Sequence, residues 1–273
     1  MAEPHHERSH MSYECIEMER RGAGAWVWIN RPDALNAISP ALVADLDKAM
    51  DEVEADPTVR ALIISGRGRA FSAGADLKFV KRALGGSDFT EFRAFTNYLM
   101  KVFNRLETFS KPVIAAVNGL ALAGGLELLL CCDLVIAAQS ARIGDAHANF
   151  GLLPGGGSSA RLPRKIGVTK AKFLLYTGDF LPAQEMYEAG LVNQVVPDDQ
   201  LIAATDKVVE TLSKKSPLSI ARVKNLVLDG MEQPLDQALR LELLAFEAYS
   251  HSHDLKEGLD AFNNKRTPKF NGT

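Results

Sequence analysis

The sequence predicts an α/β fold built around a parallel sheet with helices on both faces. Short apolar runs typical of buried strands alternate along the chain with longer segments whose apolar residues recur at helical spacing. With 273 residues and 47% hydrophobic content, the chain is long enough to bury a full core. A sustained alternation of strand and helix is the pattern that a parallel, doubly covered sheet requires.

The N-terminal elements follow from alternation and from a capping pattern. Residues 13–20 and 24–32 alternate apolar and polar side chains, which predicts two antiparallel strands joined by a short turn. Residues 38–56 then show helical spacing, with Ser39 as the expected N-cap and Pro40 at the first helical position. The apolar positions of this helix are Leu42, Leu46, Met50 and Val53.

The alternation continues through the middle of the chain. Strands are expected at residues 60–66, 112–119 and 134–138. Helices are expected around residues 89–109 and from about Gly124 onward. Each of these helical segments lies between two of the strands, as a parallel sheet demands.

The rest of the chain divides into a loop and a helical end. Residues 141–167 are rich in Gly and Pro and are expected to form a loop. The part after Pro197 looks almost wholly helical, with apolar positions at Leu239, Leu241, Leu244, Phe246, Leu259 and Phe262. We therefore predict a disordered tail at residues 1–11, a core at 12–197 and a helical region at 198–273 that packs on a further surface, such as another subunit.

Charge and cysteine content argue against several classes of function. The 31 basic and 34 acidic residues give a net charge of −3, and no long basic block is present to bind nucleic acid. Cys15, Cys131 and Cys132 suit neither a disulfide framework nor a metal site, so we expect no metal and a reducing cytoplasm. The polar opening residues show no apolar stretch of a secretory signal.

The segment Gly119–Ala138 raises the question of how so apolar a stretch accommodates Glu127. It has the length of a membrane-spanning helix. Glu127 and Asp133 would each cost roughly 2.5–3.5 kcal/mol near the centre of such a helix, and Gly124–Gly125 interrupts it. We therefore expect a buried element and no membrane association, and a carboxylate that must either reach solvent or be held for a purpose.

Two glycine-rich turns, Phe71–Asp76 and Ala121–Glu127, each follow an expected strand and open an expected helix. This position leaves backbone N–H groups without partners inside the helix, at its positive end. Glycine at a single junction of this kind is usually only steric relief. A pair of such turns with a buried glutamate is less ordinary and directs attention to this part of the chain.

Five segments occur in order along the chain: NRPDALNAI, AFSAGADLK, NGLALAGGLELLLCCDLVIA, FGLLPGGGSSARLPRKIG and DLKEGLDAFNNKR. Together they resemble the signatures of the enoyl-CoA hydratase/isomerase, or crotonase, family over nearly all of the chain beyond its tail. The resemblance implies a crotonase-like spiral of β-β-α repeats and a C-terminal helical region used in trimer contacts, hence a homotrimer or a dimer of trimers. It also implies acyl-CoA thioester substrates, with coenzyme A as part of the substrate and no tightly bound cofactor.

The resemblance further implies an oxyanion hole formed by the backbone N–H groups of Ala75 and Gly124. An enolate formed from a thioester carries its charge on one oxygen, which two preset donors stabilise without reorganisation. In other enzymes the loss of one such donor costs about 2.7–4 kcal/mol. The missing side chain at Gly124 allows the thioester to come close.

Glu127 occupies the position of the family's catalytic carboxylate, which activates water or moves a proton. A helix N-terminus favours its charged form by about 0.3–1 kcal/mol, whereas full burial raises a carboxyl pKa by about 3–5. In a dry pocket burial would win and leave Glu127 ready to exchange a proton near neutral pH. The alternative, a glutamate that only caps its own helix, explains the position in the first turn but not the apolar residues beside it.

His147 stands where the family hydratases have a second glutamate. Histidine is also a competent acid and base, with an ordinary pKa of about 6.5, which keeps hydration through Glu127 and His147 open. If the backbone is extended here, Asp145 and His147 project to the same side, and Asp145 would orient or charge the imidazole. The alternative is that His147 only holds its loop by a hydrogen bond.

By motif position, the resemblance also implies a set of residues that bind CoA. This set consists of Ala73, Ala75, Asp76 and Leu77 near the adenine and Lys78 near a phosphate. Asp33 stands where many relatives have a lysine, so one phosphate contact of the family is not expected here. Phe262 and Lys265 match positions that reach the nucleotide of a neighbouring subunit, although alone they would be interpreted as helix packing and a solvated charge.

The sequence therefore predicts a lyase of fatty acid metabolism, a 2-enoyl-CoA hydratase or isomerase with Glu127 and His147 as its acid and base. An alternative within the same fold is a hydrolase or C–C lyase that acts on a β-keto acyl thioester through His147 and Asp145. A third hypothesis is a non-catalytic CoA-binding paralogue, which would follow if the missing second glutamate meant lost catalysis.

Overall fold

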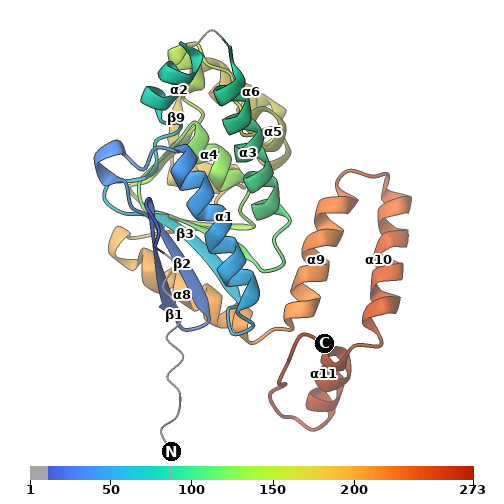
Figure 1. The fold of residues 1–273 in the computed structure, drawn as a ribbon. Coiled ribbons are helices and arrows are strands. Elements are labelled where there is room, and N and C mark those ends of the chain that lie inside the picture. Colours follow the sequence, from blue (N-terminus) through green and yellow to red (C-terminus); the bar gives the residue numbers. More distant parts are fainter. Residues whose placement is uncertain (1–11, 86–87) are drawn as a thin grey trace, which may run out of the picture.

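The computed structural model describes residues 12–85 and 88–273 (Figure 1). The predicted tail at residues 1–11 lies outside these ranges. Within them, the chain forms a body of two sheets and surrounding helices, followed by a group of C-terminal helices.

The core of the body is a six-stranded sheet. Its strands lie in the order β1 (Ile16–Arg21), β2 (Gly24–Ile29), β3 (Ala61–Gly66), β5 (Val113–Val117), β7 (Leu134–Ala138) and β10 (Gln194–Val196). β1 and β2 pair antiparallel, as their alternation predicted, and the other pairs are parallel. β2, β3 and β5 are buried along their whole length, which is why they consist mainly of apolar residues. The predicted α/β class is confirmed.

A second sheet has four strands of three residues each: β4 (Ala70–Ser72), β6 (Leu120–Leu122), β8 (Arg142–Gly144) and β9 (Phe180–Pro182). β4, β6 and β8 follow β3, β5 and β7 along the chain and pair in parallel. Each repeat thus contains a long strand, a short strand and then a helix, which confirms the predicted spiral of β-β-α repeats. The sequence pattern does not reveal the short strands, because three residues cannot show an alternation.

Helices cover the two sheets. They are α1 (Pro40–Ala55), α2 (Leu77–Leu84), α3 (Thr90–Glu107), α4 (Gly124–Leu130), α5 (Ser158–Ile166), α6 (Val168–Thr177), α7 (Ala183–Glu188) and α8 (Leu201–Ser213), with the 3-10 helices η1 (Pro32–Ala34), η2 (His147–Phe150) and η3 (Asp198–Gln200). Ser39 caps α1 as predicted, because its hydroxyl accepts the N–H of Leu42 at 3.2 Å. The expectation of a loop over residues 141–167 is wrong, since β8, η2 and α5 lie there.

The C-terminal helices stand beside the body, and the predicted helical end of the chain is confirmed. α8 still packs on the sheet, whereas α9 (Pro217–Gly230), α10 (Leu235–Tyr249) and α11 (His253–Asn263) project from it (Figure 1). α9 and α10 pack against each other, yet neither has a buried residue. Their exposed apolar side chains are Val223, Val227, Leu235, Leu239, Leu243, Leu244 and Phe246. An exposed apolar surface of this kind on α9 and α10 indicates an interaction site.

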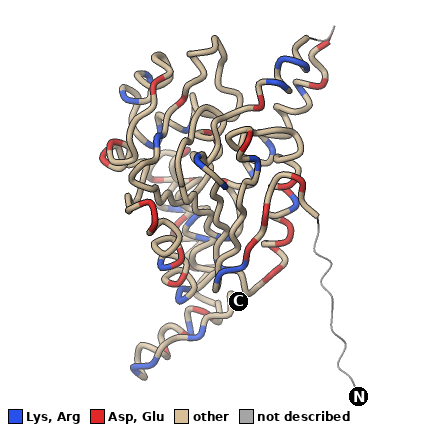
Figure 2. The backbone as a smooth tube through the Cα atoms, turned by 90° about the vertical axis from the view of Figure 1, so that its left-hand side faces the viewer, with Lys and Arg blue, Asp and Glu red and all other residues tan. Residues whose placement is uncertain are grey.

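No helix within the described ranges is long and apolar enough to cross a membrane. The apolar residues 119–138 instead fold into β6, α4 and β7, which lie inside the body. Figure 2 shows Lys and Arg interspersed with Asp and Glu along the backbone. This distribution agrees with the nearly balanced composition of 31 basic and 34 acidic residues.

Candidate active site

The turn between β6 and α4 places Glu127. Ala123, the residue before α4, has φ 48° and ψ −117°, a backbone conformation that costs energy for a residue with a side chain. A Cβ on Gly125 would lie 2.0 Å from the carbonyl oxygen of Ser72, so only glycine lets α4 pack this closely on β4. As a result the first turn of α4 directs Glu127 into the protein, where 3% of its side chain is exposed.

The carboxylate of Glu127 binds the start of another helix. Its Oε1 accepts the N–H groups of Gly156 at 2.7 Å and Ser158 at 3.2 Å, just before and at the first residue of α5. A Cβ on Gly156 would lie 2.7 Å from Oε2 and 3.0 Å from the ring of Phe103, so the glycine fits between carboxylate and ring. These contacts argue against the alternative that Glu127 only caps its own helix.

Asp145 directly follows β8, and His147 is the first residue of η2. Their approach does not come from an extended backbone, as the sequence suggested, because Ala146 between them is left-handed with φ 57°. The resulting tight turn brings Nδ1 of His147 to 3.0 Å from Oδ2 of Asp145, while Oδ1 accepts the backbone N–H of His147 at 3.2 Å. The expected proximity is therefore correct, and the expected backbone conformation is wrong.

The pair Asp145–His147 determines which imidazole nitrogen faces Glu127. An ionised carboxylate only accepts hydrogen bonds, so Nδ1 of His147 carries a proton in the bond to Asp145. The other nitrogen, Nε2, lies 3.9 Å from Oε2 of Glu127. Nε2 is thus the nitrogen that can gain or lose a proton next to Glu127.

Burial and charge act on both groups. Burial raises the pKa of Glu127 above its ordinary value, although the charge of His147 and the two N–H donors of α5 oppose this effect. Burial alone would lower the pKa of His147, but its hydrogen bond to Asp145 and the charges of Asp145 and Glu127 raise it overall. The two groups can therefore hold and exchange a proton nearer to neutral pH than a free carboxylate could.

Ala75 and Gly124 bring two backbone N–H groups close together. Ile38 forms a parallel bridge with Ala75 by bonding to the residues on either side of it, so the N–H of Ala75 points away from Ile38. A Cβ on Gly124 would lie 3.4 Å from the nitrogen of Ala75, which shows how closely the two glycine-rich turns meet. Over the described ranges, neither N–H donates to a backbone carbonyl. Both remain available to an acceptor from outside the protein.

The residues predicted to contact CoA near α2 fall into two groups. Ala73 and Asp76 use their N–H groups inside the protein, on loop carbonyls at 3.0 Å. Asp76 also caps α2 and forms an ion pair with Arg31 at 2.9 Å. Leu77 and Lys78 are exposed at the start of α2. Of these four, the last two are the side chains most open to a ligand.

Phe262 and Lys265 are not brought to the same place within one chain. Phe262 is 83% exposed near the end of α11, and Lys265 follows the helix with φ 52°. Figure 1 shows α11 far from α2 and α4. Within a single chain, the structure thus does not bring these two residues together with the turns before α2 and α4.

Sequence reasoning missed the residues that hold Glu127. The Gly155–Gly157 run falls in the stretch that the sequence predicts as a loop, yet it supplies the N–H of Gly156 to the carboxylate. The signal that could have found it is a glycine run directly before a helix, which marks a possible anion site. Cys131 and Cys132 are free and buried, and burial raises the pKa of both thiols, to about 12 for Cys131.

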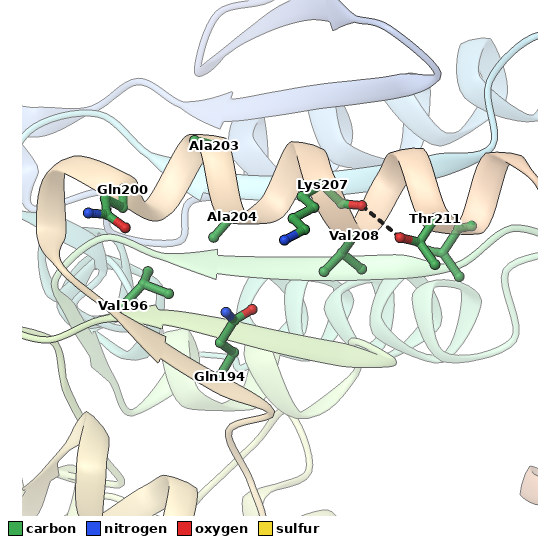
Figure 3. A pocket seen from close by; sticks show the side chains of 9 residues that line it. Gln194, Val196, Gln200, Ala203, Ala204, Lys207, Val208 and Thr211 are labelled. Carbon is green, nitrogen blue, oxygen red and sulfur yellow. Dashed lines mark hydrogen bonds between the residues drawn. The ribbon is translucent and has the colours of Figure 1, made fainter.

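A groove of about 510 Å³ lies between β10 and α8 (Figure 3). Its walls include Gln194, Lys207 and Thr211 but none of the residues predicted for catalysis or CoA binding. Among the described residues, no group of three or more His, Cys, Asp and Glu side chains is arranged to hold a metal ion. The buried Glu127–His147 pair is therefore the better candidate for a reaction centre.

Comparison with known proteins finds similarity along nearly the whole chain. The sequence model of the family described as Enoyl-CoA hydratase/isomerase matches residues 19–273. A crotonyl-CoA hydratase of Syntrophomonas wolfei is 40% identical, with 95% of this chain and 99% of the relative covered. A short-chain-enoyl-CoA hydratase of Clostridium acetobutylicum is 37% identical, with 94% and 97% covered. The crystal structure of an enoyl-CoA hydratase from Bacillus anthracis superposes with a TM-score of 0.89 at 36% identity, covering 95% of this chain and all (100%) of that one.

Proposed function

The chain belongs to the enoyl-CoA hydratase/isomerase family, and from this premise we propose that it is an enoyl-CoA hydratase, which adds water to the double bond of a 2-enoyl-CoA. The observation that carries the proposal is the buried pair in which Oε2 of Glu127 faces Nε2 of His147 at 3.9 Å. Glu127 lies in the same turn of α4 as Gly124, whose N–H donates to no backbone carbonyl in the part of the chain that the structure describes.

The thioester carbonyl oxygen would accept the N–H groups of Ala75 and Gly124. As water adds to Cβ, negative charge moves onto this oxygen, and the two fixed donors stabilise it where it develops. The close contact of the two turns keeps the donors in position before substrate arrives, so no reorganisation is needed.

Glu127 and His147 would carry the two proton transfers. Ionised Glu127 takes a proton from water at Oε2 while the water oxygen bonds to Cβ of the enoyl group. Protonated His147 then gives the proton on Nε2 to Cα of the enolate, which completes the 3-hydroxyacyl-CoA. After the reaction Glu127 is protonated and His147 is neutral. A water molecule would carry the proton from Oε2 of Glu127 back to Nε2 of His147, which lies 3.9 Å away. The same pair would move a proton along the acyl chain in an isomerisation.

Asp145 would act through His147. Its carboxylate fixes the proton on Nδ1 and stabilises the imidazolium, because an adjacent negative charge favours the charged form. In this role it keeps His147 protonated and correctly oriented while substrate is present.

The proposed substrate is an acyl-CoA thioester, with CoA near Ala73, Ala75, Asp76 and Leu77 and one phosphate near Lys78. Proton transfer by Glu127 and His147 and charge stabilisation by the N–H groups of Ala75 and Gly124 suffice for the proposed reaction. No tightly bound cofactor is therefore part of the proposal. We place the enzyme in the cytoplasm, which agrees with its three unpaired, buried cysteines.

A homotrimer, or a dimer of trimers, is the proposed assembly. The exposed apolar side chains of α9 and α10 would be covered by neighbouring subunits, and Phe262 and Lys265 would approach the nucleotide bound by a neighbour. Light scattering coupled to gel filtration checks this proposal on the full chain. We expect about three times or six times the 29.7 kDa of one chain, and a smaller species for Leu239→Glu combined with Leu243→Glu.

One observation favours a second candidate, a hydrolase or C–C lyase of β-keto acyl thioesters. The hydrogen bond from His147 to Asp145 would also let His147 activate water for attack on a carbonyl. A non-catalytic CoA-binding protein fits less well, because a buried carboxylate such as Glu127 costs stability and needs a use.

The deciding experiment follows the conjugated enoyl-thioester absorbance with trans-2-enoyl-CoAs of graded chain length. Wild type, Glu127→Gln and His147→Ala are compared, and products are identified by mass. Turnover to a 3-hydroxyacyl-CoA that needs both residues supports hydration. β-Keto acyl-CoAs are assayed in parallel, and release of free CoA or of a shortened product from them supports the second candidate. CoA binding without turnover of either substrate class supports the third.

A further inference from the structure

A second set of contacts connects Arg161 of α5 to the turn whose N–H groups bind Glu127. The guanidinium donates from Nη1 to the carbonyl oxygen of Gly156 at 2.9 Å. Its Nε and Nη2 donate to Oε2 of Glu107 at 3.0 and 2.8 Å, and Nη2 also reaches Oδ1 of Asn104 at 2.6 Å. Only 12% of the Arg161 side chain is exposed. Arg161 thus ties the turn before α5 to α3, in a single orientation.

The position of the Gly156 carbonyl makes this contact important for Glu127. Three successive peptide units lie in this turn, and the outer two donate the N–H groups of Gly156 and Ser158 to Oε1. The middle unit carries the carbonyl oxygen that Arg161 holds. Each peptide unit is planar, so the only freedom between the units lies in the dihedral angles of Gly156 and Gly157.

Both glycines are necessary for this arrangement. Gly157 has φ 111°, which residues with side chains rarely adopt, and a Cβ on it would lie 2.1 Å from Nη1 of Arg161. A Cβ on Gly156 would meet the Glu127 carboxylate. The turn therefore has close contacts with Glu127 on one side and Arg161 on the other. Because its two glycines leave the backbone flexible, these contacts must fix its conformation.

We propose that Arg161 is a positioning residue for Glu127, which holds the middle peptide so that both outer N–H groups point at Oε1 and leave Oε2 for water and His147. This inference rests on the proposed role of Glu127 as the base. It goes beyond that role because it assigns the orientation of the base to a side chain that touches neither substrate nor water.

Several charged and titratable groups of the described residues interact with Glu127. They include His147 and Asp145 from the turn at η2, Arg161 from α5 and Cys131 from α4 itself. β4 and β6, which also pack on α4, contribute no titratable side chain. Arg161 stays protonated at every relevant pH, so a change in the acid limb of the pH profile reports on Glu127 and its donors.

The test compares Arg161→Met, Arg161→Lys and the control Arg164→Met, whose exposed arginine on the same helix pairs with Glu232. For Arg161→Met we expect kcat to fall by about 10²-fold because the base is misplaced, with little change in KM. The acid limb of kcat should move to higher pH, because oriented N–H donors lower the pKa of Glu127 and are lost. Arg164→Met should retain the wild-type profile.

Arg161→Lys separates position from charge. Lysine retains the positive charge but cannot bind the Gly156 carbonyl and Glu107 together in the same fork. A profile close to that of Arg161→Met supports the proposal, whereas full restoration of kcat and of the acid limb by lysine would overturn it. A loss of kcat without movement of the acid limb would also overturn it, since that indicates only a structural role.

Two further measurements keep the test decisive. If Arg161→Met does not fold, Glu107→Gln loosens Arg161 from α3 and should move the acid limb in the same direction by less; an unmoved limb would contradict the inference. Infrared titration of the Glu127 carboxyl band, with Glu127→Gln as the blank, needs no activity. If wild type does not hydrate enoyl-CoA, the proposed function fails, while the infrared shift still decides the role of Arg161.

Discussion

Two carboxylates at opposite ends of α4 are held in different ways. Asp133 follows the helix, and its Oδ2 accepts the N–H of Val113 at 2.7 Å and the Lys224 ammonium at 2.8 Å. Glu127, in the first turn, accepts only N–H groups on Oε1 and faces His147 with Oε2. The Asp133 side chain is 26% exposed and that of Glu127 only 3%. Among the described residues, the more deeply buried carboxylate is therefore the one that forms no ion pair with a lysine or arginine.

This difference separates a structural carboxylate from one suited to exchange protons. Burial raises the pKa of both groups, but for Asp133 the main opposing charge is that of Lys224, which also forms a hydrogen bond to it. For Glu127 the main opposing charge is His147, which itself gains and loses a proton. Asp133 ties α9 to the body, whereas the charge on Glu127 depends on that of its neighbour.

The largest expected effect is on Glu127. Glu127→Gln keeps the size of the side chain and an oxygen for the two N–H donors but removes the base, so kcat should fall by about 10³-fold. Asp133→Asn, the matched change at the other end of α4, should leave kcat of the folded enzyme near wild type. Steady-state kinetics of both variants checks the comparison, and wild-type turnover by Glu127→Gln would refute the proposed mechanism.

A smaller effect is expected when the charge next to His147 is removed. Asp145→Asn should lower kcat by about 10-fold or more and move the basic limb of its pH profile to lower pH. The sign follows because the hydrogen bond and charge of Asp145 raise the pKa of His147, so without them His147 loses its proton earlier as pH rises. Kinetics from pH 5 to 10 gives this limb, and an unchanged limb would show that Asp145 does not act on the imidazole.

The smallest effect concerns stability alone. Lys224→Met removes the cation from Asp133 and should reduce the free energy of unfolding by about 1–2 kcal/mol, with kcat unchanged. Denaturant unfolding of both single variants, Lys224→Met and Asp133→Asn, and of the double variant measures the coupling between the two side chains. Additive losses would mean that the ion pair contributes no net stability. A large fall in kcat would contradict the assignment of Asp133 to a structural role and of Glu127 to catalysis.

Local sequence patterns were sufficient for much of the fold. The strand pair of β1 and β2 and the cap of α1 at Ser39 involve residues close together in the chain, so they can be recognised without a structure. The burial of Glu127 also followed from its apolar neighbours. The short strands of the second sheet could not be found this way, because their pairing depends on residues about 20 to 50 positions away, such as Ala70 with Leu120.

The sequence by itself determined which chemical groups are present: a buried glutamate, a histidine in place of a second one, and two glycine-rich turns. Only the tertiary structure decided how they meet. The donors to Glu127 lie 29 and 31 residues further along the chain, and His147 faces it through a left-handed turn at Ala146 rather than through an extended strand. The physical reason is that hydrogen bonds and charge act over a few ångströms in space, whereas periodicity reports only on neighbours along the chain.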